Sequence, residues 1–506
     1  MMSRMVRCVS LAVGLSLIGW LVSGLPAQQP GAELRYKMAY GTYLGGARWE
    51  QAREVIPYPD GSVLVGAFTA SEGMPVTEGA VQSEYGGDDP ALGHGGVYGG
   101  DGFVMHLSAD GSRILAATYF GGSKQERGIY GMGLDAEGNV VISSATRSPD
   151  VTTTEGAYQE EYGGPEADMY AARLTPDLKQ LLWCTYVGAS RNDWPRGGLG
   201  LDGQGNVYVV GGTNSPDFPL TPGVFQSQRK GERDGAIVKL SSDGSKLLLS
   251  TLLGGSAWDG LMGVRVDRAG AIYVAGHTQS ADFPVTPGAA QASLGGKSDC
   301  MLTKLSADGG RLVYSTYLGG AENEFAEHRQ WLSDDGTVLL TGVTASRDFP
   351  TTAGAYQRSL KGRNDGFLTR LSADGKRLVF STLLGGSGGD FFLMPTPDGE
   401  GNIFMAGQTE SRDFPVTPNA LQPTFGGGRS DGVLAVLSGD GSRLLYATYL
   451  GGSGEDMIRS VALGPNDSVY LVGSTGSDDF PTTPGSLQPR PGGGGDAFVV
   501  KLVGEG

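Results

Sequence analysis

A five-residue sequence, Thr-Tyr-Leu-Gly-Gly or a close variant, recurs seven times along this chain and constrains its fold more than any other feature. The first copy is Thr42–Gly46 and the last is Thr448–Gly452. Successive copies lie about 66 residues apart, with a first interval about ten residues longer, and such spacing is typical of one structural unit repeated along a chain. The repeat therefore predicts seven similar units.

Each unit contains four short segments with the composition of β-strands. In the unit from Gly320 to Gly386, two strand pairs are joined at the tight turns Asp334–Gly336 and Ala373–Gly375. An Asp-Gly turn between apolar segments is a strong hairpin signal. Four-stranded antiparallel sheets repeated around an axis form a β-propeller. We therefore predict an all-β, seven-bladed β-propeller; an open β-solenoid is the alternative, although its units are usually shorter.

The seventh unit contains only three of its four expected strands before the sequence stops. Its third strand covers Asp496–Leu502, and a segment with the fourth-strand pattern, Leu34–Leu44, precedes the first Gly-Gly. We predict that this N-terminal strand completes the last blade and removes the free sheet edges of an open array. Residues 28–506 are then a single propeller domain.

The first 27 residues predict a secretory signal peptide. Arg4 and Arg7 precede an apolar run from Val9 to Val22, and Ala27 offers a small residue for cleavage. The run is short for a membrane span, so an uncleaved anchor is the less favoured alternative. We expect a secreted protein in the periplasm, at the cell surface or outside the cell.

Composition limits the partners of such a protein. The sequence has 86 glycines and only 18% charged residues, which suits short strands and tight turns. A formal net charge of −16 makes nucleic acid and anionic membranes poor partners. Cys184 and Cys300, the cysteines left after cleavage, lie two repeats apart and are expected to be buried thiols, not a disulfide. We expect a monomer.

Three motifs recur in order and give the chain a family resemblance. They are the Tyr-Leu-Gly-Gly end, the stretch Gly205–Val209 and the run Asp282–Ala289. Over essentially the whole mature chain this pattern resembles the SBBP repeat family, bacterial repeats named for seven-bladed β-propellers. The resemblance implies secretion or display at a bacterial cell surface, with no common reaction and no catalytic residues. The departures are Ala189 in place of a glycine and Asp150–Thr152 in place of Asp-Phe-Pro.

An acidic residue follows each second glycine of the motif (or Ala189) by four positions in all seven units. The seven residues, here called the ring acids, are Glu50, Glu126, Asp193, Asp259, Glu324, Asp390 and Asp456. Because they stand between the outer strand of one unit and the inner strand of the next, we expect them to ring the mouth of a central channel. Two interpretations are open. The ring acids bind a cation or polar ligand, or each accepts backbone N–H bonds and fixes its own crossover loop. Like charges about 10 Å apart repel by only roughly 0.4 kcal/mol in water, so no metal is required.

Two further sets of residues recur in the loops. An aspartate opens every third strand and is expected to cap the preceding loop: Asp101, Asp168, Asp234, Asp299, Asp365, Asp431 and Asp496. Thr-Pro pairs such as Thr286–Pro287 predict a short helical turn in each unit. The phenylalanines of the Asp-Phe-Pro runs are expected to pack between blades: Phe218, Phe283, Phe349, Phe414 and Phe480.

Residues that differ between the units are the better indicators of function. The candidate aromatic binding residues beside the ring acids are Trp49, Trp194, Trp258, Phe325 and Phe391. Arg48, Arg127 and Arg191 are close to them in sequence. Crossover loops and long loops share one face of a propeller, and binding residues usually lie on loops. Aromatic planes beside charged groups suit a glycan or a peptide, although such rings also fill channels or pack between blades.

The sequence gives little indication of catalysis. It contains no His-Glu-x-x-His, Gly-x-Ser-x-Gly or phosphate-loop motif, and His94 and His328 are isolated. We predict no cofactor and no catalytic residue, with a cation at the ring acids left open. The favoured function is a binding or scaffold module for a protein or glycan on the loop-rich face. The alternatives are a polysaccharide hydrolase or lyase that uses channel-mouth carboxylates, and a purely structural surface protein.

Overall fold

The computed structural model describes residues 34–88, 99–195, 198–326 and 329–505. Within residues 34–506, which form one compact unit, the chain builds seven antiparallel sheets. The predicted signal peptide, His94 and His328 lie outside the described residues. No helix in the described ranges has the length and hydropathy of a membrane span.

The seven sheets are numbered here as blades in chain order. Blade 1 contains β2 (Glu50–Pro57), β3 (Val63–Thr69), β4 (Asp101–Leu107) and β5 (Ile114–Phe120). Blade 2 contains β6 (Gly131–Leu134), β7 (Val140–Thr146), β8 (Asp168–Leu174) and β9 (Leu181–Val187). Blade 3 contains β10 (Asp193–Trp194), β11 (Gly200–Leu201), β12 (Val207–Thr213), β13 (Asp234–Leu240) and β14 (Leu247–Leu253).

Blade 4 contains β15 (Asp259–Val266), β16 (Ile272–Thr278), β17 (Asp299–Leu305) and β18 (Leu312–Leu318). Blade 5 contains β19 (Glu324–Phe325), β20 (Trp331–Leu332), β21 (Val338–Thr344), β22 (Asp365–Leu371) and β23 (Leu378–Leu384). Blade 6 contains β24 (Asp390–Pro397), β25 (Ile403–Thr409), β26 (Asp431–Leu437) and β27 (Leu444–Leu450). Blade 7 contains β28 (Asp456–Leu463), β29 (Val469–Thr475), β30 (Asp496–Gly504) and β1 (Tyr36–Leu44), with a short 3₁₀ turn, η2 (Pro465–Asp467).

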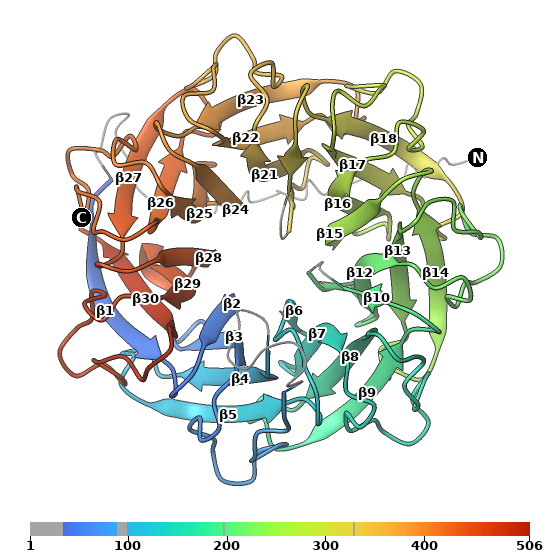
Figure 1. Ribbon diagram of the computed structural model, residues 1–506, viewed down its shortest axis with the longest axis horizontal. Coiled ribbons are helices and arrows are strands. Elements are labelled where there is room, and N and C mark those ends of the chain that lie inside the picture. Colours follow the sequence, from blue (N-terminus) through green and yellow to red (C-terminus); the bar gives the residue numbers. More distant parts are fainter. Residues whose placement is uncertain (1–33, 89–98, 196–197, 327–328, 506) are drawn as a thin grey trace, which may run out of the picture. The chain divides into compact units, whose positions relative to one another are not determined.

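The sheets are arranged radially around a common axis, with the first strand of each blade innermost and the fourth at the rim (Figure 1). This arrangement confirms the seven-bladed propeller. The N-terminal strand closes it as predicted, because β1 pairs antiparallel with β30, Tyr36 opposite Gly504 and Leu44 opposite Ala497. The last sheet therefore has the strand order β1-β30-β29-β28.

The inner strands differ between blades. Those of blades 1, 4, 6 and 7 are continuous with one β-bulge each. Those of blades 3 and 5 are interrupted, as β10/β11 and β19/β20, and β6 of blade 2 is short. A bulge or break bends a strand and re-aims its side chains. The wall of the channel is consequently the least symmetric part of the fold.

The loops between second and third strands form β-turns instead of the predicted helical turns. In blade 4 the N–H of Ala289 donates to the carbonyl of Thr286 at 3.1 Å, and Gly288 has a φ of 77°. Proline at the second position and a positive-φ glycine at the third define a type II turn. The helical prediction was wrong because this glycine takes a conformation that a helix excludes.

The hydrophobic core consists of clusters that span neighbouring blades. One cluster joins Tyr208 and Val210 of blade 3 to Val264 and Val274 of blade 4, with Phe283 among them. The five loop phenylalanines are all buried, as predicted. Cys184 and Cys300 are buried and unpaired, also as predicted. Each blade thus depends on its neighbours to cover its faces.

Candidate functional site

The ring acids occupy equivalent places at the start of the inner strands, but they are covered by protein. All seven are at most 1% exposed. The ring acids therefore stand at the starts of the inner strands but do not present their carboxylates to solvent. Every ring acid accepts a hydrogen bond from the backbone N–H four residues earlier, the second glycine of the motif or Ala189.

Side-chain hydroxyl groups also donate hydrogen bonds to these carboxylates. Asp390, for example, accepts hydrogen bonds from Thr409 and, at 2.9 Å, from the hydroxyl of Ser411. Glu50 accepts one from Thr69 at 2.8 Å. These contacts agree with the second interpretation of the ring acids, in which each carboxylate fixes its own crossover loop. Among the described residues, no group of three or more His, Cys, Asp or Glu is placed to hold a metal ion.

The third-strand aspartates are loop caps, as predicted, and each lies next to the ring acid of the following blade. Asp365 accepts the backbone N–H groups of Lys361 and Gly362 at 2.9 and 3.1 Å. A Cβ placed on Gly385 would lie 2.7 Å from both the Asp365 carboxyl carbon and an Asp390 oxygen. The first glycine of the repeat is thus needed because two carboxyl groups pack against its Cα.

Burial raises the pKa values of several of these paired acids. It raises the pKa of Asp101 to about 7 and the pKa of its partner Glu126 well above the usual value. Burial also raises the pKa of Asp168 to about 7 and that of Asp193 to about 6. The acids beneath the crossover loops of blades 2 and 3 therefore carry less than their full negative charge at neutral pH.

A pocket of about 270 Å³ opens where the crossover loops of blades 2, 3 and 4 meet. We call it the Arg–Trp pocket; its lining residues are Arg127, Arg147, Asn192, Trp194, Arg233 and Trp258. None of these described lining residues is a carboxylate. Each residue immediately precedes or follows a ring acid, the end of a second strand or the start of a third strand. The inner-strand geometry therefore brings three guanidinium groups and two indoles together.

Stacking holds several of these side chains in place. The guanidinium carbon of Arg127 lies 3.8 Å from the centre of the Trp194 ring. The Arg233 side chain donates to the carbonyl of Gly212 at 3.3 Å. Trp258 stacks on His277 with ring centres 4.7 Å apart, and His277 meets Phe325 edge-on.

The five predicted aromatic residues are thus only partly brought together. Trp194 and Trp258 line the Arg–Trp pocket, and Phe325 adjoins it through His277. Trp49 in blade 1 and Phe391 in blade 6 are half-buried and do not belong to the pocket lining.

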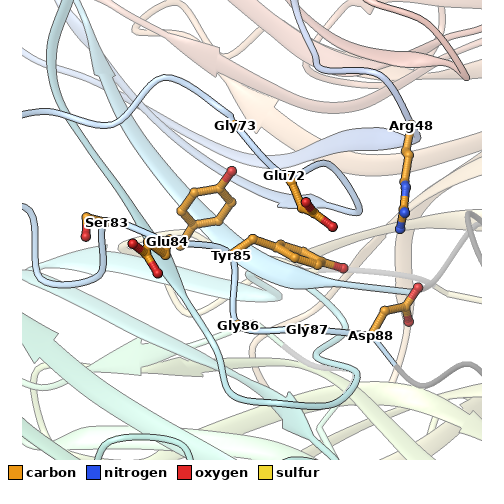
Figure 2. Close-up of a pocket in the computed structure, with 10 residues that line it drawn as sticks. Arg48, Glu72, Gly73, Ser83, Glu84, Tyr85, Gly86, Gly87 and Asp88 are labelled. Carbon is orange, nitrogen blue, oxygen red and sulfur yellow. The ribbon is translucent and has the colours of Figure 1, made fainter.

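A second hollow, of about 620 Å³, lies in blade 1. Figure 2 shows Arg48, Glu72, Tyr85 and Asp88 directed toward it. It belongs to the unit with the longer loop, and its lining residues lead into residues 89–98, outside the described residues. Arg48 therefore belongs to a different hollow from Arg127.

The central channel is crossed by one side chain. Arg329, between β19 and β20 of blade 5, forms an ion pair with Glu54 of blade 1 and donates to the carbonyl of Met132 in blade 2 at 3.3 Å. The two side chains are 13% and 2% exposed. Nearby, Arg53 stacks on Tyr130 at 4.4 Å. The contacts of Arg329 join blades on opposite sides of the ring.

Comparison with known proteins agrees with the repeat pattern. Residues 182–219 match the model of the SBBP β-propeller repeat. This segment therefore resembles one SBBP repeat, within a chain that folds as a seven-bladed β-propeller. No curated protein matches this chain significantly.

Several solved structures are similar over most of this chain. A protein of unknown function from Dyadobacter fermentans is 12% identical, with 93% of this chain and 99% of that chain covered and a TM-score of 0.41. A europium-containing methanol dehydrogenase is 11% identical, with coverages of 92% and 93% and a TM-score of 0.41. A quinohemoprotein alcohol dehydrogenase from Comamonas testosteroni is 11% identical, with coverages of 92% and 76% and a TM-score of 0.41. At these values the similarities support no conclusion about function.

Sequence reasoning missed half of the residues that line the Arg–Trp pocket. Arg147, Asn192 and Arg233 were not singled out, and Arg191, which was, is exposed and outside the pocket lining. A comparison of the seven units with one another could have identified two of these residues. Arg147 and Arg233 flank the ends of paired strands at positions where most other units have small or uncharged residues.

Proposed function

We propose that this β-propeller is a secreted bacterial binding module that takes a glycan or protein ligand on its crossover-loop face. The observation that supports the proposal is the Arg–Trp pocket, where planar aromatic and guanidinium groups converge at a break in the symmetry of the ring. Architectural features repeat in every blade, as the ring acids do. A feature confined to blades 2, 3 and 4 instead fits a requirement of one ligand.

The proposal is tested by a glycan-array, protein-capture and polysaccharide-cleavage screen of the purified protein. Ligands identified with the wild-type protein are measured again with Trp194→Ala and Trp258→Ala. We expect each variant to weaken binding about tenfold or more, because central tryptophans often dominate binding energy. The matched control is Trp49→Ala, since Trp49 and Trp258 both precede a ring acid but only Trp258 lines the pocket. Equal binding by all three variants contradicts the proposal.

Secretion is a separate part of the proposal and rests on the signal-peptide pattern of residues 1–27. Expression in a Gram-negative host, followed by fractionation and N-terminal sequencing, is expected to give an exported chain that begins after Ala27. A chain retained in the cytoplasm with its first residues intact would exclude this part while leaving the binding proposal standing. Light scattering of the exported chain is expected to show a monomer.

A further inference from the structure

The Arg–Trp pocket differs in charge from the rest of the molecule. The chain has a formal net charge of −16, yet three of the six described residues that line this pocket are arginines and none is acidic. Buried acids lie close to this lining: Glu126 and Asp193 are sequence neighbours of Arg127 and Trp194, and Asp234 and Asp259 directly follow Arg233 and Trp258. Burial raises the pKa values of Glu126, Asp193 and Asp259, which lowers the negative charge that these three acids set against the arginines. The pocket therefore attracts negative charge.

The arginines are held in orientations suited to a planar anion. Stacking on Trp194 fixes the plane of the Arg127 guanidinium, and the Gly212 carbonyl anchors Arg233. A fixed guanidinium binds carboxylate and sulfate-like groups through paired N–H donors, with less loss of side-chain entropy than a free one. Arg127 of blade 2 and Arg233 of blade 3 thus present N–H donors on the same side of the Arg–Trp pocket.

Polar atoms in the same wall lack a protein partner. Within the described chain, the indole N–H of Trp194, Oδ1 of Asn192 and Nε of Arg147 are buried and make no hydrogen bond. Buried polar atoms are ordinarily paired, so each of these carries a cost. A polar ligand bound at this wall would supply the missing partners, and its hydroxyl groups can both donate to Asn192 and accept from Trp194.

The aromatic part of the pocket suits a ring. Trp258 is half-buried, one face of its indole is covered by His277, and the residue lines the pocket. A volume of about 270 Å³ is near the lower end of the roughly 300–1,000 Å³ of small-molecule sites. The pocket therefore has room for one small cyclic unit, with any longer chain passing over the opening.

We propose that the Arg–Trp pocket binds one anionic sugar unit, carboxylated or sulfated, of an acidic polysaccharide. This inference rests on the proposed function and specifies its ligand class. The anion pairs with the arginines, the sugar ring packs on Trp258, and the hydroxyl groups meet Asn192 and the Trp194 indole. A sugar ring is favoured over an acidic peptide because a glutamate or aspartate side chain has no ring to cover the indole and no hydroxyl for the unpaired amide oxygen.

The test uses four polymers of defined chemistry: polygalacturonate, dextran sulfate, neutral dextran and polyglutamate. Binding to the purified full-length chain is measured by calorimetry at low and at physiological salt. We expect at least one of the two anionic polysaccharides to bind tenfold or more tighter than dextran and polyglutamate, and to weaken with salt. Comparison of polygalacturonate with dextran sulfate distinguishes a carboxylate from a sulfate ligand.

The variants Arg147→Gln and Arg233→Gln are each expected to weaken that binding about tenfold or more, because each removes a charge-assisted hydrogen bond. The matched control is Arg363→Gln, which removes an exposed arginine from the same kind of loop in blade 5, where it pairs with Glu410. It should change the affinity less than about twofold. An unchanged unfolding midpoint shows that each variant is folded.

Preference for dextran or polyglutamate, or equal affinity in the Arg147, Arg233 and Arg363 variants, overturns the inference. These outcomes differ from failure of the proposed function. If a neutral glycan or protein binds and depends on Trp258 but not on the arginines, the binding module stands and only the acidic ligand is excluded. If no ligand depends on Trp194 or Trp258, both are excluded.

Discussion

Removal of either partner of the ion pair between Arg329 and Glu54 is expected to destabilise the ring strongly. Arg329 extends from blade 5 across the channel to Glu54 of blade 1 and the backbone of blade 2. The two side chains are 13% and 2% exposed. If one partner is removed, water therefore solvates the remaining charge only poorly. Removing one partner of such a buried pair typically costs about 3–5 kcal/mol, because the other charge stays buried and uncompensated.

We therefore expect Arg329→Met and Glu54→Leu each to lower the free energy of unfolding by about 3–5 kcal/mol. The double variant should cost much less than the sum, since replacing a buried pair by apolar groups is often nearly neutral. The coupling in this double-mutant cycle is then about 3 kcal/mol or more, at the upper end for residues in contact. Urea unfolding followed by tryptophan fluorescence and by circular dichroism measures all four proteins and shows whether one transition describes them.

The control is Arg268→Met, which breaks an ion pair with Asp334 whose side chains are 94% and 97% exposed. Exposed pairs contribute roughly 0–1 kcal/mol, so this variant should be close to wild type. If Arg329→Met is no more destabilising than Arg268→Met, or if the two channel substitutions are additive, Arg329 does not couple the opposite blades and this reasoning is refuted.

Three other predictions follow from the repeat. First, stability should fall as pH rises from 4 to 8, because buried acids such as Asp101, with its pKa raised to about 7, bind protons that the unfolded chain has released; a lower thermal midpoint at pH 5 than at pH 8 would contradict this. Second, Gly254→Ala should lower the stability by more than about 2 kcal/mol in urea unfolding, because the new Cβ would lie 2.8 Å from Oδ2 of Asp259; Gly223→Ser, with nothing within 4 Å although its φ is positive, should cost less. Third, deletion of residues 34–44 should expose the edge of β30 and cause aggregation, visible by light scattering; a monomeric, fully folded deletion variant would show that closure is dispensable.

The architecture could be predicted because each unit repeats the same local chemistry. Tight turns and strand-length apolar segments recur in the units, and all Gly-Gly ends but Gly188–Ala189 are kept, so seven copies give one consistent answer. The pairing of Leu34–Leu44 with the last unit followed from counting strands, and β1 and β30 have that pairing. The helical turn was mispredicted because proline after threonine fits both a helix start and a type II turn, and only the positive φ of Gly288 decides between them.

The site could be predicted less well, because it depends on how units meet. Whether the ring acids are open or covered depends on the path of the crossover loops, which the spacing alone does not reveal. Arg147 and Arg233 come together with Trp258 only because three consecutive blades present their loop ends to one point. Arg329 reaches Met132, 197 residues earlier, and no local pattern predicts a contact between opposite blades. The repeat predicts the features that the units share, whereas the residues of the proposed binding site differ between the units.

The pairing of the first strand with the last also dictates when this protein can finish folding. The hydroxyl of Thr42 donates a hydrogen bond to the carbonyl of Gln488, 446 residues later in the chain. Strand β1 therefore cannot complete its contacts until this later part of the chain has been synthesised. At a synthesis rate of about 5–20 residues per second, that wait is on the order of half a minute to a minute and a half. During this interval β1 and the newest blade both have unpaired backbone groups. Until β30 has been synthesised, β1 therefore has no partner strand with which to pair.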